Sequence, residues 1–186
     1  MNVLSVFMVT NPPQGGWSEL GQTRPPLLKL FVALIFPLSL LPSAMLFYAG
    51  THYGNAMVTG YSSKPWGSIA IVFFLTEVVT VLLMGWLVGQ VARQHQAQLS
   101  TRDAYLIAGL APVPLWLSSL ALLVPNPLFT LVVAGLAFAF SCRLVYNGVY
   151  ALCQLRDGVA AAAITHTVMG ANLFVWAMLL WLIVAL

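Results

Sequence analysis

Five long stretches of this chain contain almost no charged residues, and this feature restricts the possible fold more than any other. Only 6% of the 186 residues are charged, and 61% are hydrophobic, whereas soluble domains carry about 25% charged residues. A helix needs about 20 apolar residues to cross a bilayer. The sequence therefore predicts an all-α polytopic membrane protein with five transmembrane helices. The predicted spans are Leu27–Tyr48, Trp66–Gly89, Tyr105–Val124, Pro127–Leu155 and Val159–Leu186.

The links between the predicted helices indicate which helices are neighbours. Ser100 and Asp103 fit a capping box at the start of helix three, and Asn126–Pro127 fits an N-cap followed by a proline at the first helical position. Gly158 is expected to take a left-handed conformation that ends helix four. Because the last two links are short, helices three, four and five are expected to be antiparallel neighbours.

The two remaining links differ from these short turns. The link at residues 49–65 is long and rich in Gly, Tyr, Thr and Ser, so it is expected to be the freest loop. The link at residues 90–104 is polar, and it is expected to extend helix two into water. Pro37 and Pro42 predict kinks in the first helix.

The distribution of basic residues predicts the orientation. Five of them flank one side of the predicted bundle, and only Lys64 flanks the other. The five are Arg24, Lys29, Arg93, Arg102 and Arg156. Cytoplasmic loops carry an excess of Lys and Arg, so we expect residues 1–26 to form a cytoplasmic N-terminal segment and residues 27–186 the transmembrane domain. The C-terminus is then expected on the outer side.

Two ionisable residues lie at membrane depth, where charge is costly and usually faces the protein interior. Glu77 is eleven residues into helix two, and Arg143 is sixteen residues into helix four from its outer end. Their depths differ by less than about 10 Å, so we expect an ion pair if these helices touch. The alternatives are a proton or anion site, and snorkelling of Arg143 alone to the cytoplasmic surface.

Further polar side chains accompany these two residues. Arg143, Tyr146, Asn147 and Tyr150 recur at three- and four-residue spacing, so they share one face of helix four. That face either forms interhelical hydrogen bonds, which are common in membrane bundles, or lines a polar cavity. The other intramembrane polar candidates are Thr76, Thr80, Ser141, His166 and Asn172.

Prolines and small residues mark special backbone positions. Pro112 and Pro114 remove two backbone donors near the middle of helix three, which either kinks the helix or frees carbonyls for a cation, as in discontinuous transporter helices. Gly85 and Gly89 form a Gly-x-x-x-Gly motif that allows close packing, either inside the monomer or in a homo-oligomer. Ala163, Thr167 and Ala171 form a similar small-residue stripe in helix five.

Several function classes find no support in the residues. Cys142 and Cys153 lie on one helix about 16 Å apart, too far for a mutual disulfide, and no Cys/His cluster predicts a metal site. Only His166 of the three histidines is intramembrane, which disfavours haem. No nucleophile motif such as Gly-x-Ser-x-Gly is present. We therefore expect no catalytic residues, no metal and no cofactor, and we interpret the basic balance as a topology signal rather than nucleic-acid binding.

Three motifs resemble the Yip family, named for interaction with Rab-type GTPases, and within it the small YohC-like bacterial branch. They are Phe7–Pro12 followed by Trp17–Leu20, Ala108–Ser118 in helix three, and Arg143–Val149 in helix four. The resemblance covers about residues 7–186 and implies five helices with a cytoplasmic N-terminus in the bacterial inner membrane. Glu77 and Arg143 depart from the family pattern.

The resemblance supplies no reaction, so the expected function is non-enzymatic. The leading interpretation is a membrane-organising or partner-binding protein that acts at its cytoplasmic face, where Trp17 and Leu20 rest on the headgroup layer or on the bundle. The alternative is a transporter or channel for a small solute, ion or proton that uses Glu77 and Arg143. The lipid bilayer is the one certain partner of such a chain.

Overall fold

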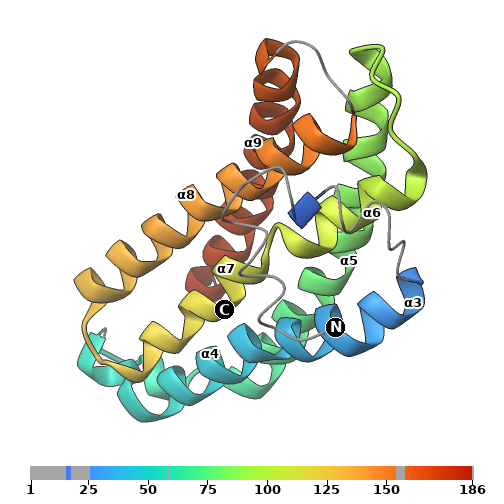
Figure 1. Ribbon diagram of the computed structural model, residues 1–186. Helices are drawn as coiled ribbons and strands as arrows, with labels where there is room; N and C mark the ends of the chain where they lie inside the picture. Colours follow the sequence, from blue (N-terminus) through green and yellow to red (C-terminus); the bar gives the residue numbers. More distant parts are fainter. Residues whose placement is uncertain (1–15, 18–25, 58, 154–157, 186) are drawn as a thin grey trace.

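A computed structural model describes residues 16–17, 26–57, 59–153 and 158–185. It contains five helices that are long and apolar enough to cross a membrane, which confirms the fold class (Figure 1). The candidate spans are Leu27–Asn55, Trp66–Gln94, Thr101–Leu123, Pro127–Leu152 and Gly158–Trp181. The motifs Phe7–Pro12 and Leu20, and the basic residues Arg24 and Arg156, lie outside the described residues.

The first span is built from three consecutive pieces. They are α3 (Leu27–Leu30), the π-helix η1 (Phe31–Ile35) and α4 (Phe36–Met57). The π-helical turn ends two residues before Pro37. A proline has no N–H and its ring crowds the carbonyl four residues earlier, and the wider π-turn accommodates both effects. Pro42 lies inside α4.

The link that follows α4 is not the free loop that its composition predicts. Residues 49–57 continue α4, and Tyr61–Ser63 form the short 3-10 helix η2. Asn55 and Ser62 fasten the link with two reciprocal hydrogen bonds of 3.0 and 3.1 Å between their side chains and backbone amides. Gly60 provides the turn, with a φ of 87°, a left-handed conformation that glycine adopts without strain.

The second span, α5 (Trp66–Gln94), extends five residues beyond the predicted Gly89, as its polar continuation predicts. Helix three is interrupted. It consists of α6 (Thr101–Leu110), α7 (Val113–Ser118) and the 3-10 helix η3 (Ser119–Leu123). Ser100 caps α6 by accepting a hydrogen bond from the Asp103 amide at 3.1 Å. Helix three is the most buried of the five spans, so its break lies inside the bundle.

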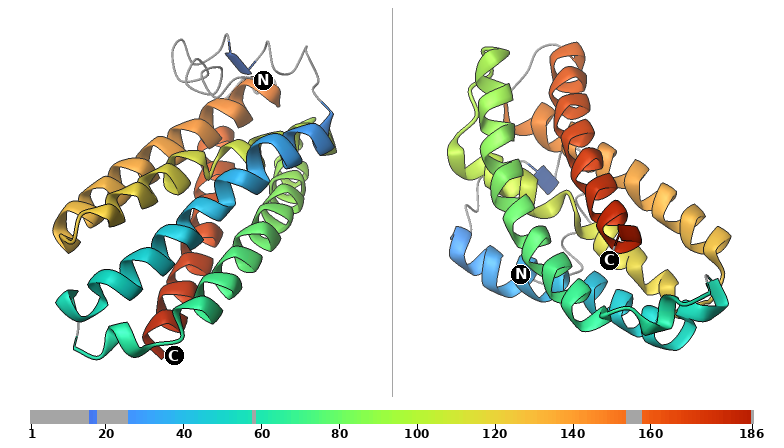
Figure 2. Two further views of the ribbon diagram at one scale, coloured as in Figure 1. Left: turned by 90° about the horizontal axis from the view of Figure 1, so that it is seen from below. Right: turned by 180° about the vertical axis from the view of Figure 1, so that it is seen from behind.

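The last two spans are α8 (Pro127–Leu152) and α9 (Gly158–Ala185). The Asn126 side chain caps α8 by accepting from the Phe129 amide at 3.1 Å, as predicted. Gly158 is the first residue of α9 rather than a left-handed terminator of helix four. Helix α8 packs against α7 and α9, as the short links predict, while α5 packs against α6, α4 and α9 (Figure 2).

The buried side chains form two clusters. The larger one surrounds the inner face of helix three and includes Ile107, Leu110 and Trp116. The smaller one joins the first half of α5 to the last half of α9 through Phe73 and Leu179. Large apolar side chains cover the outward faces of α5, α8 and α9, a surface that suits lipid rather than water. The exposed residues include Leu75, Leu82, Leu131, Leu136, Phe140, Phe174 and Trp181.

Candidate functional site: a buried carboxyl at the break in helix three

Glu77 lies on the inner face of α5, about 16 Å along the helix from Trp66, which is about half of a 30 Å hydrocarbon core. Its side chain is only 4% exposed. The indole N–H of Trp116, on α7, donates a hydrogen bond of 2.9 Å to Oε2. The other carboxyl oxygen, Oε1, is buried and has no hydrogen-bond partner among the described residues. One half of this carboxyl is therefore unsatisfied.

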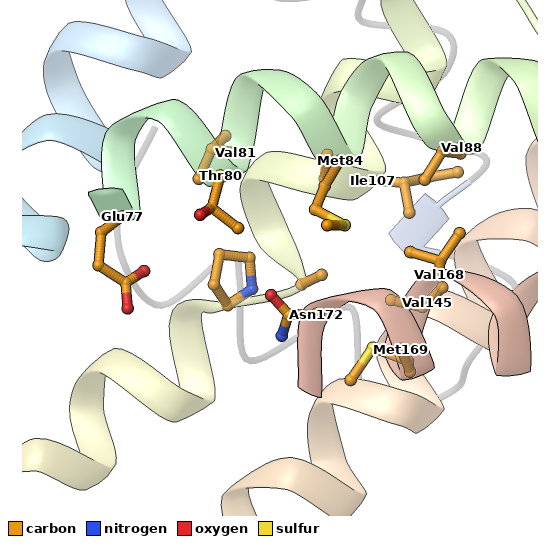
Figure 3. Close-up of a pocket in the computed structure, with 13 residues that line it drawn as sticks. Glu77, Thr80, Val81, Met84, Val88, Ile107, Val145, Val168, Met169 and Asn172 are labelled. Carbon is orange, nitrogen blue, oxygen red and sulfur yellow. The ribbon is translucent and has the colours of Figure 1, made fainter. Parts of the chain in front are cut away.

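A cavity adjoins the carboxyl, between α5, the break in helix three and α9 (Figure 3). The space open to the centres of water molecules is about 30 Å³. A buried water needs about 10–15 Å³ of such space, so the cavity has room for about two waters. Its polar side chains are Glu77, Thr80 and Asn172. The apolar lining includes Val81, Met84, Val88, Ile107, Val145 and Val168.

The break in helix three contributes backbone to the same cavity. Ala108, Ala111 and Pro112 all line it. Because Pro112 has no N–H, the carbonyl of Ala108 lacks its usual helical donor. A discontinuous helix inside a membrane is tolerated where it is buried in protein or lines a cavity, and this one does both. Helix three is thus broken between Leu110 and Val113, whereas a proline more commonly only kinks a helix.

The predicted ion pair between Glu77 and Arg143 is wrong. Arg143 is exposed, and the free Oε1 of Glu77 has no partner in the described part of the chain. Arg143 shares the outward stripe of α8 with Leu136 and Phe140, and α8 packs mainly on α7 and α9 rather than on α5. Its exposed position about 14 Å from the end of α8 fits the snorkelling alternative instead.

The other polar residues of helix four do not line this cavity, to which α8 contributes only Val145. Tyr146 and Tyr150 are half-buried and stack on each other with ring centroids 6.2 Å apart, and Asn147 is half-buried as well. Elsewhere, Thr76 is half-buried, His166 is exposed and Ser141 is fully buried. Of the predicted candidates, Glu77, Thr80, Asn172 and Pro112 come together, while Pro114 lies two residues further along in α7 and does not line the cavity.

The Gly-x-x-x-Gly motif of α5 packs inside the monomer. A Cβ placed at Gly85 would overlap the ring of Tyr105, and one at Gly89 would lie 3.7 Å from the Cβ of Ala104. Both neighbours belong to α6, so the motif brings α5 and α6 together and is not available to a second copy. In the stripe of α9, Thr167 is exposed while Ala163 and Ala171 are half-buried.

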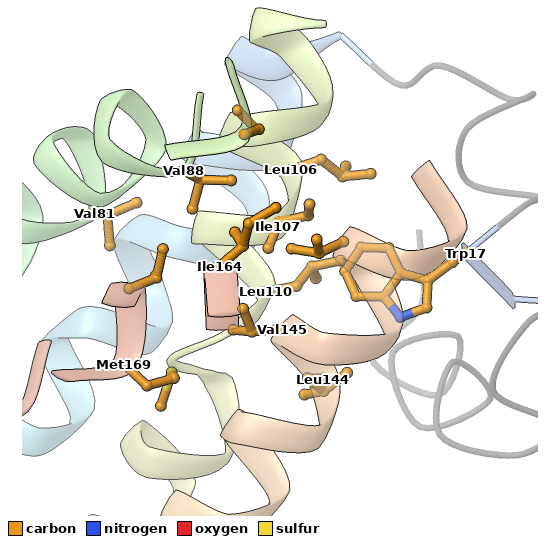
Figure 4. Close-up of a cluster of buried hydrophobic side chains, with 14 of the residues drawn as sticks. Trp17, Val81, Val88, Leu106, Ile107, Leu110, Leu144, Val145, Ile164 and Met169 are labelled. Atoms are coloured by element: carbon orange, nitrogen blue, oxygen red, sulfur yellow. The ribbon is translucent and has the colours of Figure 1, made fainter. Parts of the chain in front are cut away.

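Trp17 is the buried residue whose position the sequence predicts least well. Its side chain is 0% exposed and joins the larger core cluster beside Ile107 and Leu110 (Figure 4). Gly148 on α8 makes room for it, because a Cβ there would lie 3.0 Å from the indole ring. Of the two expected positions, the headgroup layer is therefore wrong, and the indole packs into the bundle. Trp116 was also missed, although its place just after two prolines was a usable signal.

Comparison with known proteins gives one result that agrees with this architecture. The sequence profile of the Yip1 domain matches residues 7–185. The chain belongs to the Yip1 domain family. No curated protein and no solved structure is significantly similar to it. The Yip1 domain thus includes all five spans, and the segment Ala108–Ser118, which carries the resemblance, contains both the helix break and Trp116. The cavity is part of the Yip1 domain rather than an addition to it.

Proposed function

We propose that this Yip1-domain protein moves a small cation, a proton or a metal ion, across the membrane, with Glu77 as the binding group. The observation that carries the proposal is the unpartnered Oε1 of Glu77 beside a water-sized cavity at mid-membrane depth. Ionisable residues inside membranes are costly, and they mark ion pathways and proton relays. The carbonyl freed by Pro112 adds a second acceptor at the same place.

A purely structural role explains the carboxyl less well. As an acceptor for the Trp116 indole, residue 77 needs only one oxygen, and a glutamine would supply it without a charge. The second oxygen is buried and unsatisfied in a side chain that lines the cavity, which costs free energy unless water, a proton or a cation satisfies it. A membrane-organising role requires no polar interior, so the geometry favours transport over the role expected from the family resemblance.

The proposal is tested by reconstitution in liposomes. Glu77→Gln keeps the size and the acceptor for Trp116 but removes the titratable group. Uptake of protons or of alkali cations down an imposed gradient is expected in the wild type and should fall to the level of empty liposomes in the variant. Thr76→Val is the matched control, since Thr76 is half-buried beside Glu77 on the same helix, donates to the Val72 carbonyl and does not line the cavity. Equal uptake by the wild type and Glu77→Gln would refute the proposal.

We also propose that the protein lies in the bacterial inner membrane with its N-terminus in the cytoplasm. Support comes from the bias of basic residues and from Lys64, which lies at the opposite end and donates from Nζ to the Ile183 carbonyl near the end of α9. In a variant without native cysteines, Thr59→Cys should react with an impermeant maleimide on intact cells. Gln98→Cys should react only after the membrane is opened. The reverse pattern would invert the topology.

A partner-binding role at the cytoplasmic face is the second candidate. It is favoured by the end of α5, where Arg93, Gln94 and His95 are exposed beyond the apolar part of the span. A photo-crosslinking residue at position 95 should give one discrete protein adduct in living cells. Adducts to lipid alone would remove this candidate and would leave the transport proposal unaffected.

A further inference from the structure

The Glu77 site contains features that distinguish between a proton and a metal ion. We propose, resting on the transport function above, that the cation bound at Glu77 is a proton, and that Trp116 enforces this selectivity by occupying Oε2. The indole then acts as a specificity-determining residue, while Oε1 is the atom that receives the proton. The number of oxygen atoms, the direction of the Trp116 bond and the surrounding charges all favour a proton.

The oxygen atoms around the cavity are few. Hard cations such as Ca²⁺ and Mg²⁺ take about six or more oxygen ligands. The described lining supplies Oε1 of Glu77, the hydroxyl of Thr80, the amide oxygen of Asn172 and the backbone carbonyl of Ala108. Most of the remaining lining is Val, Met, Ile and Ala. A metal ion inside this space would leave room for only about one of the two waters, so its shell would be incomplete. A proton needs only one oxygen to bind and one acceptor nearby.

The direction of the Trp116 bond also opposes a metal ion. The indole nitrogen is a donor only, and it directs its N–H at Oε2 over 2.9 Å. A metal ion bound by both oxygens would have to share Oε2 with the positive end of this dipole, which would repel it. A neutral carboxylic acid, in contrast, fits the arrangement completely. Its carbonyl-type Oε2 accepts from the indole, and its Oε1–H donates to a water in the cavity.

The proton transfer itself is a simple exchange with water. A hydronium in the cavity gives its proton to Oε1, where an O–H bond forms and leaves a neutral water. Release reverses this step, with the bonding electron pair staying on Oε1. No oxidant or other reactant is needed. Thr80 and Asn172 form no hydrogen bonds with the described residues, so both are available to orient the cavity waters.

In the described part of the chain, no other charged side chain lines the cavity beside Glu77. The cavity is lined by residues of α5, α6, α8 and α9 and by the break in helix three, and Glu77 is the only titratable residue among them. Arg143 is exposed on the outward stripe of α8. The neutral form of Glu77 is therefore the one that avoids an uncompensated charge inside the bilayer, and binding of one proton produces it.

Selectivity in liposomes tests this inference. Wild-type protein should take up protons at the same rate when all Na⁺ and K⁺ are replaced by a bulky organic cation, and it should take up no ²²Na⁺ above empty liposomes. Trp116→Phe keeps an aromatic ring but removes the N–H, so both oxygens become available. We expect Na⁺ and Li⁺ then to slow proton uptake severalfold. Trp86→Phe is the matched control, because Trp86 is 56% exposed on the outward face of α5.

The outcomes separate the inference from the function on which it rests. Glu77-dependent ²²Na⁺ uptake by the wild type would overturn the proton assignment and leave transport standing. Absence of any Glu77-dependent movement of either cation would refute transport itself. Unchanged selectivity in Trp116→Phe would overturn the role of the indole. If Trp116→Phe fails to fold, the wild-type comparison of Na⁺ with the organic cation still decides the identity of the cation.

Discussion

The indole nitrogen of Trp116 lies 2.9 Å from Oε2 of Glu77 and connects the segment after the helix-three break to the middle of α5. The bond spans 39 positions of sequence and is buried at both ends. It holds the carboxyl at the edge of the cavity, with one oxygen satisfied and the other buried without a partner among the described residues. The break in helix three and the carboxyl in helix two thus form one site.

The energetic coupling of Glu77 distinguishes its two suggested partners. Residues in contact show interaction energies of about 0.5–3 kcal/mol in double-mutant cycles, whereas distant residues are additive within about 0.5 kcal/mol. Glu77→Leu and Trp116→Phe should be coupled, because they remove the acceptor and the donor of one bond. Glu77→Gln and Arg143→Gln should be additive. Thermal unfolding in detergent measures both cycles. Energetic coupling between residues 77 and 143 would contradict this account and support an ion pair between them.

Trp17 and Gly148 should depend on each other for stability. Trp17→Ala leaves a cavity in the core and should cost about 3–5 kcal/mol. Gly148→Ala forces a Cβ to 3.0 Å from the indole and 3.2 Å from Ile107, an overpacking that typically costs about 1–3 kcal/mol. In the Trp17→Ala background, Gly148→Ala should cost less, since the ring has gone. Trp86→Ala, on the exposed face of α5, should change the unfolding temperature little. If Gly148→Ala lowered the free energy of unfolding equally in both backgrounds, Trp17 would not pack against Gly148.

Cys153 offers a pH-dependent test just beyond the end of α8. Burial, and secondarily the negative charge of Asp103, raises the pKa of this thiol to about 11 from its ordinary value of 9.0. The folded protein therefore keeps the neutral, unreactive thiol, and its stability should fall as pH rises above about 9, where the unfolded thiol ionises. In a Cys142→Ala background, maleimide labelling of Cys153 should be slow at pH 8 and faster in Asp103→Asn. Rapid labelling of the folded protein at pH 8 would contradict the burial.

The sequence was sufficient to predict the five spans, because bilayer thickness and hydrogen bonding impose a length and a composition on each of them. The caps at Ser100 and Asn126 could be predicted for a similar reason, since they depend only on residues within three positions. The link at residues 49–65 was misjudged, because the bonds between Asn55 and Ser62 form across a turn and leave no periodic signal.

The candidate site was only half predictable. Depth follows from counting residues along a helix, so Glu77 and Asn172 were recognised as intramembrane polar groups. The rotation of each helix about its axis, and the choice of neighbours, do not follow from depth. Arg143 was therefore assigned to the interior although it lies on the lipid-facing stripe of α8. The partner of Glu77 is instead a tryptophan, which hydropathy counts as one more residue favourable to a membrane helix.

Infrared difference spectroscopy of the reconstituted protein tests the protonation of Glu77 most directly. The spectrum of the wild type minus that of Glu77→Gln, recorded at neutral pH, isolates the vibrations of this one side chain. The account predicts a carboxylic-acid C=O band that is lost in the variant, and that shifts in Trp116→Phe because the hydrogen bond to Oε2 is removed. A difference spectrum with only carboxylate bands, insensitive to the indole, would show that Glu77 carries no proton and would contradict the account.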